Sequence, residues 1–166
     1  MQIARPFRVK RNRVVKNGEL ERAVQQAVRD RENAGCIMVL LDADEDCPAQ
    51  LGPSLLQRCR RATGLPVSVV LANKEFEAWF LGAKESLRGI RGIRADSTPP
   101  YDPERISGAK ELLSRNMERR RYLAVDDQAA FADKMDLSVA EQSCPSFGKL
   151  VRDVADLVSA LGTDTR

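Results

Sequence analysis

Two short apolar runs limit what this chain can fold into. Residues 36–42 are apolar up to a final aspartate, and residues 67–72 form a second run rich in valine. Such runs are typical of strands that are covered on both faces. Apolar residues recur at helical spacing over 19–31, after Pro53 and over 74–87. Strands that alternate with helices pair in parallel and carry helices on the faces of the sheet.

The rest of the chain extends this pattern at both ends. Residues 7–15 read as a further, basic strand, and 88–107 are rich in Gly and Pro without sustained periodicity. We therefore predict one α/β domain over 1–166, a three-layer parallel-sheet domain with a helical C-terminal portion. It consists of a β-α-β-α-β-α core over 1–87, a loop over 88–107 and a helical extension over 108–166, with helices near 108–121, 127–135 and 146–161.

The composition removes several classes of site. The chain of 166 residues contains no histidine, which excludes Ser-His-Asp and Cys-His nucleophile systems and zinc sites built on histidine. Its four cysteines show no C-x-x-C spacing, and we predict that they are structural. Carboxylates, lysine, arginine and metal ions remain as tools for catalysis.

The sequence gives no sign of a membrane or secreted protein. The longest apolar run is far shorter than a membrane span. The first sixteen residues are basic and contain no apolar core of the kind that a secretory signal requires. We expect a cytoplasmic protein without a membrane partner.

Acidic residues follow the first apolar run. Asp42, Asp44, Glu45 and Asp46 stand within five positions, and two unit charges about 4 Å apart repel by roughly 4 kcal/mol at an effective dielectric of about 20. In an extended segment Asp42, Asp44 and Asp46 point the same way. Convergent carboxylates suit Mg²⁺ or Mn²⁺, so we predict a metal site. The alternative is a solvated loop that favours the N-terminus of a helix near Pro53.

Polar residues also follow the second run. Ligands of open α/β sheets sit at the carboxyl ends of the strands, so Lys74 and Glu77 should share an edge with the acidic loop. Glu77 is a candidate catalytic carboxylate, and its alternative role is to stabilise the first turn of a helix. Lys74 is a candidate phosphate contact or a solvated lysine. Trp79 and Phe80 are predicted to lie in the core.

Basic residues are clustered although the net charge is only +3. Arg8, Lys10, Arg11 and Arg13 lie on the predicted N-terminal strand, and we select them as candidate contacts to nucleic-acid phosphates. Further clusters occur at Arg88, Arg91 and Arg94 and at residues 119–121. The alternative for all of these is a solvated surface.

Several segments together resemble a known family. The pieces LLDADEDCPA, LPVSVVLANKEFEAWFLGAKESLRG, GAKELL and SCPSFGKLVRD are similar to the bacterial domain-of-unknown-function family numbered 4276, which is regarded as Toprim-like. The resemblance implies a Toprim-like, Rossmann-like fold and a Mg²⁺- or Mn²⁺-dependent site for phosphodiester chemistry on nucleic acid. Asp42 and Asp44 match the Asp-x-Asp of that site, Asp46 is an auxiliary ligand, and Glu77 matches the glutamate of the EFEAWF element. The resemblance also implies that the protein acts together with an ATPase partner in phage defence, as relatives of this broad class are thought to do.

One element of the Toprim pattern is missing. Toprim domains carry a glutamate at the end of a strand that precedes the first strand seen here, and no Val-Glu-Gly-like element occurs near the N-terminus. Either that segment lies upstream of this chain or the glutamate is lost. If the glutamate is lost, one hypothesis is that Glu77 takes its place. The other is that the protein binds nucleic acid without cleaving it.

The functional expectation is thus a Mg²⁺-dependent nuclease or phosphodiester-handling domain. The first alternative is a catalytically degenerate Toprim-like binding subunit. The second is a haloacid-dehalogenase-like phosphatase with Asp42 as nucleophile and Asp44 as general acid, because an Asp-x-Asp after an apolar strand also fits that class. A homodimer is compatible with the helical C-terminal half.

Overall fold

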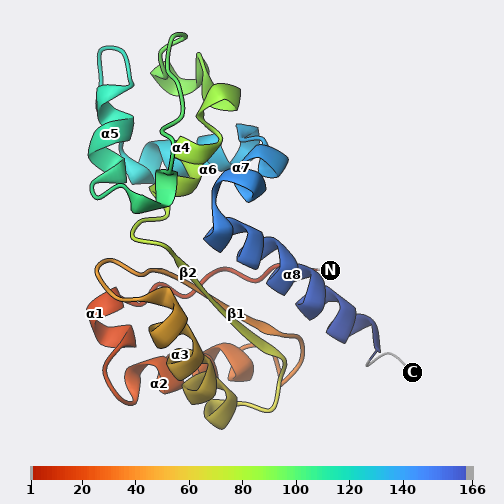
Figure 1. The fold of residues 1–166 in the computed structure, drawn as a ribbon. Coiled ribbons are helices and arrows are strands. Elements are labelled where there is room, and N and C mark those ends of the chain that lie inside the picture. The colour runs from red at the N-terminus through yellow and green to blue at the C-terminus, as the bar shows by residue number, and fades with distance from the viewer. Residues whose placement is uncertain (1, 164–166) are drawn as a thin grey trace. The chain divides into compact units, whose positions relative to one another are not determined.

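The computed structural model describes residues 2–163 and shows a mixed α/β chain (Figure 1). Its main elements are α1 (Arg11–Val14), α2 (Glu19–Arg29), β1 (Ile37–Asp42), α3 (Pro48–Ala62), β2 (Val67–Ala72), α4 (Glu77–Gly82), α5 (Ala109–Arg115), α6 (Ala124–Lys134), α7 (Leu137–Ser143) and α8 (Pro145–Thr163). Short 3-10 helices, η1 (Lys84–Leu87), η2 (Ile90–Gly92) and η3 (Pro103–Arg105), lie between α4 and α5.

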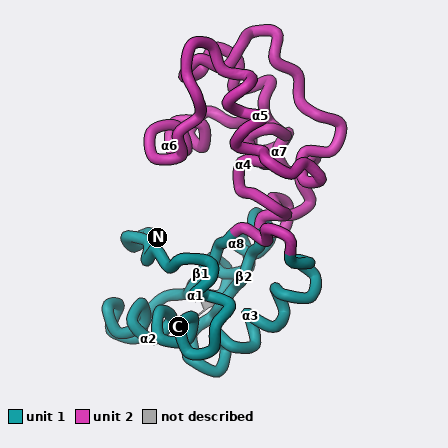
Figure 2. The backbone as a smooth tube through the Cα atoms, turned by 90° about the vertical axis from the view of Figure 1, so that its left-hand side faces the viewer, with its two compact units in different colours: residues 1–41, 46–71, 150–166 teal, residues 42–45, 72–149 magenta. Residues whose placement is uncertain are grey.

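The chain divides into two compact units (Figure 2). Among the described residues, unit 1 comprises 2–41, 46–71 and 150–163, and unit 2 comprises 42–45 and 72–149. Both strands reach unit 2 with their last residue, Asp42 or Ala72. The loops that follow the two strands therefore begin in the same unit.

The sheet is built from β1 and β2. The amide of Ile37 donates to the carbonyl of Pro66 at 2.8 Å, and that of Ala43 donates to Ala72 at 2.9 Å. Residue numbers rise together along both strands, so the pair is parallel, as predicted. Residues 68–72 of β2 are buried, whereas Leu40 of β1 is 42% exposed. The expectation that β1 is covered on both faces was therefore wrong, because only β2 is enclosed in this way.

The strand predicted over 7–15 is absent. Residues 2–10 are irregular and α1 follows, so the sheet in the described residues has two strands and the three-layer arrangement is not confirmed. The alternation that favours a strand holds for Phe7 and Val9 and breaks at Arg11, where a buried face would have to accept a charge.

Arg58 of α3 fixes the turn that replaces this strand. Its guanidinium donates to the carbonyls of Val14 at 3.1 Å and Lys16 at 2.6 Å and to the Glu21 carboxylate at 2.7 Å. The hydrogen bond from Arg58 lowers the pKa of Glu21 to about 2. A single side chain thus satisfies backbone carbonyls that a sheet partner would otherwise have to satisfy.

The helices of unit 1 follow the predicted pattern with one change. α2 buries Leu20 and Val24, and α3 buries Leu55 and Cys59. α3 begins at Pro48 and not near Pro53, which lies inside the helix. Pro48 supplies the preferred first helical position, since its missing N–H has no intrahelical partner there.

Unit 2 packs around the aromatic residues of α4. Trp79 and Phe80 are 1% and 0% exposed, which confirms their predicted place in the core. The ring of Phe80 contacts Phe131 edge-on at a centroid distance of 5.4 Å, and Trp79 contacts Phe147 at 5.2 Å. These pairs join α4 to α6 and to the first turn of α8 within the same unit.

The C-terminal helices depart from the prediction in two ways. α7 was not predicted; its N-terminus is capped by the Asp136 side chain, which accepts from the amides of Ser138 and Val139. α5 ends at Arg115 and not near residue 121. The apolar residues of α8 are only partly buried. Leu157 is buried, but Val151, Val154 and Val158 are 37%, 40% and 43% exposed.

Two further sequence expectations concern cysteines and membranes. All four cysteines are free thiols, and Cys59 and Cys144 are buried. Burial raises the pKa of Cys59 to about 11 and that of Cys144 to about 12, which keeps both thiols protonated. Within residues 2–163, no helix has both the length and the apolar composition needed to cross a bilayer.

α4 packs closely against the end of α7 in unit 2. A Cβ atom at Gly82 would stand 2.6 Å from the Cys144 sulfur and 3.2 Å from the Cβ of Ser143. We predict that Gly82→Ala lowers the free energy of unfolding by about 1–3 kcal/mol, the usual cost of overpacking, although alanine favours helix more than glycine. Urea unfolding measures the change. Gly64→Ala is the control, because a Cβ there meets no heavy atom within 4 Å; equal stability of the two variants would contradict the packing.

Candidate functional site

The loops after β1 and β2 are hydrogen-bonded to each other in unit 2. The amide of Asp44 donates to the carbonyl of Lys74 at 3.0 Å, and Asp42 Oδ1 accepts from the Phe76 amide at 2.7 Å. Asp44 and Lys74 have φ angles of +50° and +61°. Left-handed backbone is costly for a residue such as lysine, so these bonds hold a strained reversal that turns residues 75–77 back toward Asp42.

Glu75 is engaged by the start of α5. Its Oε1 accepts from the amides of Gly108 at 2.9 Å and Ala109 at 3.2 Å, and its Oε2 accepts from the amide of Lys110 at 3.3 Å. A carboxylate at this position satisfies amides that have no partner within the helix. Glu75 thus fixes the first turn of α5, and with it Lys110, beside the ends of the strands.

Glu77 is buried with only one of its oxygens satisfied. The side chain is 1% exposed, and Oε1 accepts from the Tyr122 hydroxyl at 3.0 Å. Oε2 is buried and has no hydrogen-bond partner. Burial raises the pKa of Glu77, and the attraction of Lys110 opposes this only in part. Burial and the neighbouring Glu77 carboxylate raise the pKa of the Tyr122 hydroxyl, which therefore remains a donor.

The ammonium of Lys110 lies among three carboxylates. Its Nζ is 3.5 Å from Glu77 Oε2 and 4.0 Å from both Asp42 Oδ2 and Glu75 Oε2. These are ion-pair distances, longer than a good charged hydrogen bond of about 2.7–2.9 Å. Partial burial lowers the pKa of Lys110, but the carboxylates together raise it. With every group ionised, three negative charges face one positive charge.

Asp42 shares this environment. Burial raises its pKa, and the hydrogen bond from the Phe76 amide opposes the rise. Its side chain is 29% exposed, whereas the Lys110 side chain is 46% exposed. The site is therefore open to solvent on the side of Lys110 and closed on the side of Glu77.

The structure brings together only part of the predicted set. Asp42 and Glu77 meet at Lys110. Asp44 is exposed in the loop after β1. Asp46 belongs to unit 1, where its carboxylate accepts a short hydrogen bond from Arg11. The three aspartates are not on one side of an extended segment as expected, because the left-handed φ of Asp44 breaks the two-residue repeat.

The predicted phosphate contacts are dispersed. Arg8 and Lys10 are exposed in the irregular segment before α1, and Arg13 lies 4.0 Å from Glu19. Lys74 donates to the Ser107 hydroxyl at 2.5 Å within unit 2. These basic residues of unit 1 do not share a strand, since that strand does not form.

Sequence reasoning missed the roles of Glu75, Lys110 and Tyr122. Glu75 was visible beside Glu77 at the end of the second strand, but its capping of α5 depends on the tertiary fold. Lys110 and Tyr122 lie more than thirty residues from Glu77 in the chain. The one available signal was the GAKELL segment that resembles the family.

Asp42 and Glu77 are the candidate metal ligands of this site, since each directs a carboxylate oxygen toward a cation. Among the described residues, no three acidic or thiol side chains are placed to hold one metal ion, and Glu75 is occupied by α5. Asp42 Oδ2 and Glu77 Oε2 both face the Lys110 ammonium. Mg²⁺ in proteins often binds one or two carboxylates and keeps water for its other positions.

Comparison with known proteins identifies the family alone. No curated protein and no solved structure gave a match. The sequence profile of the family described as "Domain of unknown function (DUF4276)" matches residues 2–155, which is almost the whole chain and includes every residue of the acidic site. The chain therefore belongs to the DUF4276 family.

Proposed function

We propose that this protein binds a divalent cation, Mg²⁺ or Mn²⁺, between Asp42 and Glu77 and acts there on phosphodiesters of nucleic acid. The observation that supports the proposal is Glu77 Oε2, a buried carboxylate oxygen without a hydrogen-bond partner. A buried charge left in this state costs several kcal/mol unless it is protonated or paired. A cation supplies the missing partner.

The site residues have distinct roles in this proposal. The Phe76 amide holds Asp42 Oδ1 and the Tyr122 hydroxyl holds Glu77 Oε1, and the ion would bind the oxygens that face Lys110, Asp42 Oδ2 and Glu77 Oε2. When bound, the ion supplies a polarised water and neutralises charge on the phosphate. Lys110 is half-exposed and can withdraw toward solvent, where its ammonium is available to a phosphate oxygen.

The resemblance to Toprim domains agrees with this assignment in part. Asp42 and Asp44 correspond to the Asp-x-Asp of that class, and Glu77 takes the place of the glutamate that the Toprim pattern puts on an earlier strand. The function that we propose is that of a Toprim-like nuclease or phosphodiester-handling domain.

One observation favours a second candidate, a binding subunit without cleavage. Glu75 is another carboxylate beside the two ligands, and both of its oxygens accept from backbone amides at the start of α5. It is therefore poorly placed to take a proton from water. If no other group serves as the base, the cation holds a nucleic-acid phosphate in place without hydrolysing it.

Metal binding should be measurable as thermal stabilisation. A ligand that binds only the folded state at about 100 times its Kd adds roughly 2.7 kcal/mol, or about 5–10 °C in Tm for a chain of this size. We expect Mg²⁺ or Mn²⁺ to raise the Tm of the wild type, and Asp42→Asn or Glu77→Gln to remove most of the rise. Glu111→Gln, an exposed change beside Lys110 on α5, should keep it. Equal shifts in all four proteins would place the ion elsewhere.

Cleavage separates the two candidate functions. We expect the wild type to nick or degrade DNA or RNA with Mn²⁺ or Mg²⁺, and Asp42→Asn and Glu77→Gln to lose at least about 100-fold in rate, since one catalytic metal interaction is worth several kcal/mol. Gel electrophoresis of labelled substrates gives the rate, and Glu111→Gln is the control. A wild type that binds the ion but leaves every substrate intact would support the binding subunit.

The raised pKa of Glu77 makes stability depend on pH in the metal-free protein. Between the ordinary value of 4.5 and the raised value in the fold, the folded state holds a proton that the unfolded state has lost. The free energy of unfolding of the wild type therefore falls as pH rises through this window. We expect Glu77→Gln to gain stability relative to the wild type over the same window, measured by urea unfolding in EDTA. A stability difference that is independent of pH would contradict a raised pKa of Glu77 in the folded state.

A further inference from the structure

Two arginine-rich segments of unit 2 lie side by side. Residues 88–94 and 115–121 are joined by an antiparallel bridge between Ile93 and Met117. The amide of Arg94 donates to Asn116 at 2.9 Å, and the amide of Glu118 donates to Gly92 at 2.7 Å. Together the segments contain seven arginines and one acidic residue. We call them the arginine surface: Arg88, Arg91, Arg94, Arg115, Arg119, Arg120 and Arg121.

A buried aspartate orients two of these arginines. Asp127 is 0% exposed, and its Oδ1 accepts from Arg91 at 3.2 Å while its Oδ2 accepts from Arg120 at 2.7 Å. The two arginine side chains are 43% and 35% exposed. One carboxylate thus holds two guanidinium groups that remain open to solvent and keep one net positive charge between them.

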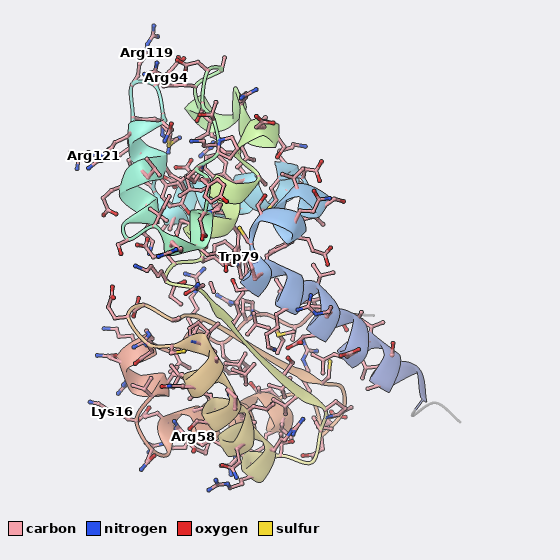
Figure 3. All side chains as sticks on the ribbon, viewed as in Figure 1. Lys16, Arg58, Trp79, Arg94, Arg119 and Arg121 are labelled. Atoms are coloured by element: carbon pink, nitrogen blue, oxygen red, sulfur yellow. The ribbon has the colours of Figure 1, made fainter. Side chains whose placement is uncertain are left out.

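Other arginines of the surface are not used within the fold. Among the described residues, the exposed side chains of Arg115, Arg119 and Arg121 make no hydrogen bond or ion pair. Figure 3 shows Arg119 and Arg121 extending away from the ribbon. Arg94 pairs with Asp96, but both side chains are more than half exposed, so a phosphate can replace the aspartate at little cost.

The backbone supports a role for these side chains. Arg91 and Arg119 have φ angles of +51° and +59°. This left-handed region suits glycine or asparagine, and it is unfavourable for a long side chain such as arginine. Strain of this kind is often retained where a side chain has a function. Here both strained positions carry a guanidinium that reaches the surface.

We infer that the arginine surface binds the sugar–phosphate backbone of a nucleic acid. Guanidinium groups match phosphate oxygens in a bidentate fashion, and neither segment exposes a large apolar side chain that would anchor it in a lipid bilayer. The segment 115–121 also runs from the end of α5, which carries Lys110, to Tyr122, which bonds to Glu77. The inference rests on the proposed function for the identity of the polyanion.

Salt-dependent DNA binding in EDTA tests this surface separately from the metal site. Each phosphate contact contributes about −0.9 to the slope of log K against log salt for duplex DNA. With a fluorescein-labelled duplex and fluorescence anisotropy, we expect Arg119→Ser/Arg121→Ser to weaken binding and to reduce the slope by about 1–2. Arg119→Lys/Arg121→Lys should restore most of the slope, because lysine also contacts phosphate as a point charge.

The matched control removes two adjacent arginines from the other unit. Arg60→Ser/Arg61→Ser changes the charge equally at exposed positions of α3 and should leave the slope unchanged. Equal losses in both double variants would reduce the effect to net charge and overturn the inference. Binding to phosphatidylserine vesicles with none to DNA would also overturn it. Loss of cleavage or of metal binding in Asp42→Asn, with DNA binding in EDTA intact, concerns the proposed function alone.

Discussion

A buried carboxylate with one unsatisfied oxygen is the constraint on which the candidate site depends. The Tyr122 hydroxyl satisfies Glu77 Oε1, and the ammonium of Lys110 stands 3.5 Å from Oε2 without completing a hydrogen bond. Removing a charge from water costs several kcal/mol, and an ion pair repays this only with good geometry. The fold therefore either keeps a proton on Glu77 or needs a better cation than the one it supplies.

The rest of the site can be understood from this deficit. Glu75 does not relieve it, because its oxygens cap α5; instead it brings Lys110 to the ends of the strands and adds another negative charge. Asp42 faces the same ammonium with its Oδ2. A single lysine thus serves three carboxylates, and its own exposure lets it leave when a stronger cation arrives. A structural ion pair does not need three carboxylates for one ammonium, and this excess of negative charge is what the proposed metal site would use.

The sequence predicted where the candidate site lies better than it predicted which residues belong to it. Parallel strands end at one edge, so Asp42 and Glu77 could be expected to meet, and they do. The choice of Asp44 and Asp46 assumed an extended loop, which the left-handed φ of Asp44 prevents. The strand predicted over 7–15 does not form, and the Arg58 guanidinium instead serves as the hydrogen-bond partner of the carbonyls of Val14 and Lys16 at the end of this segment. Both errors come from contacts between residues distant in the chain, which local periodicity cannot show.

The distribution of charge in unit 2 connects the two proposals. A site whose carboxylates outnumber its ammonium repels a phosphodiester unless a cation is present, whereas the arginine surface attracts one at all times. Binding at the surface needs no metal, but entry of a phosphate into the site does. If both proposals hold, nucleic acid is retained first by arginines such as Arg119 and Arg121, and the cation then determines whether its backbone can approach Glu77. This order follows from the signs of the local charges. Although the whole chain has a net charge of only +3, the carboxylate site is negative and the arginine surface is positive.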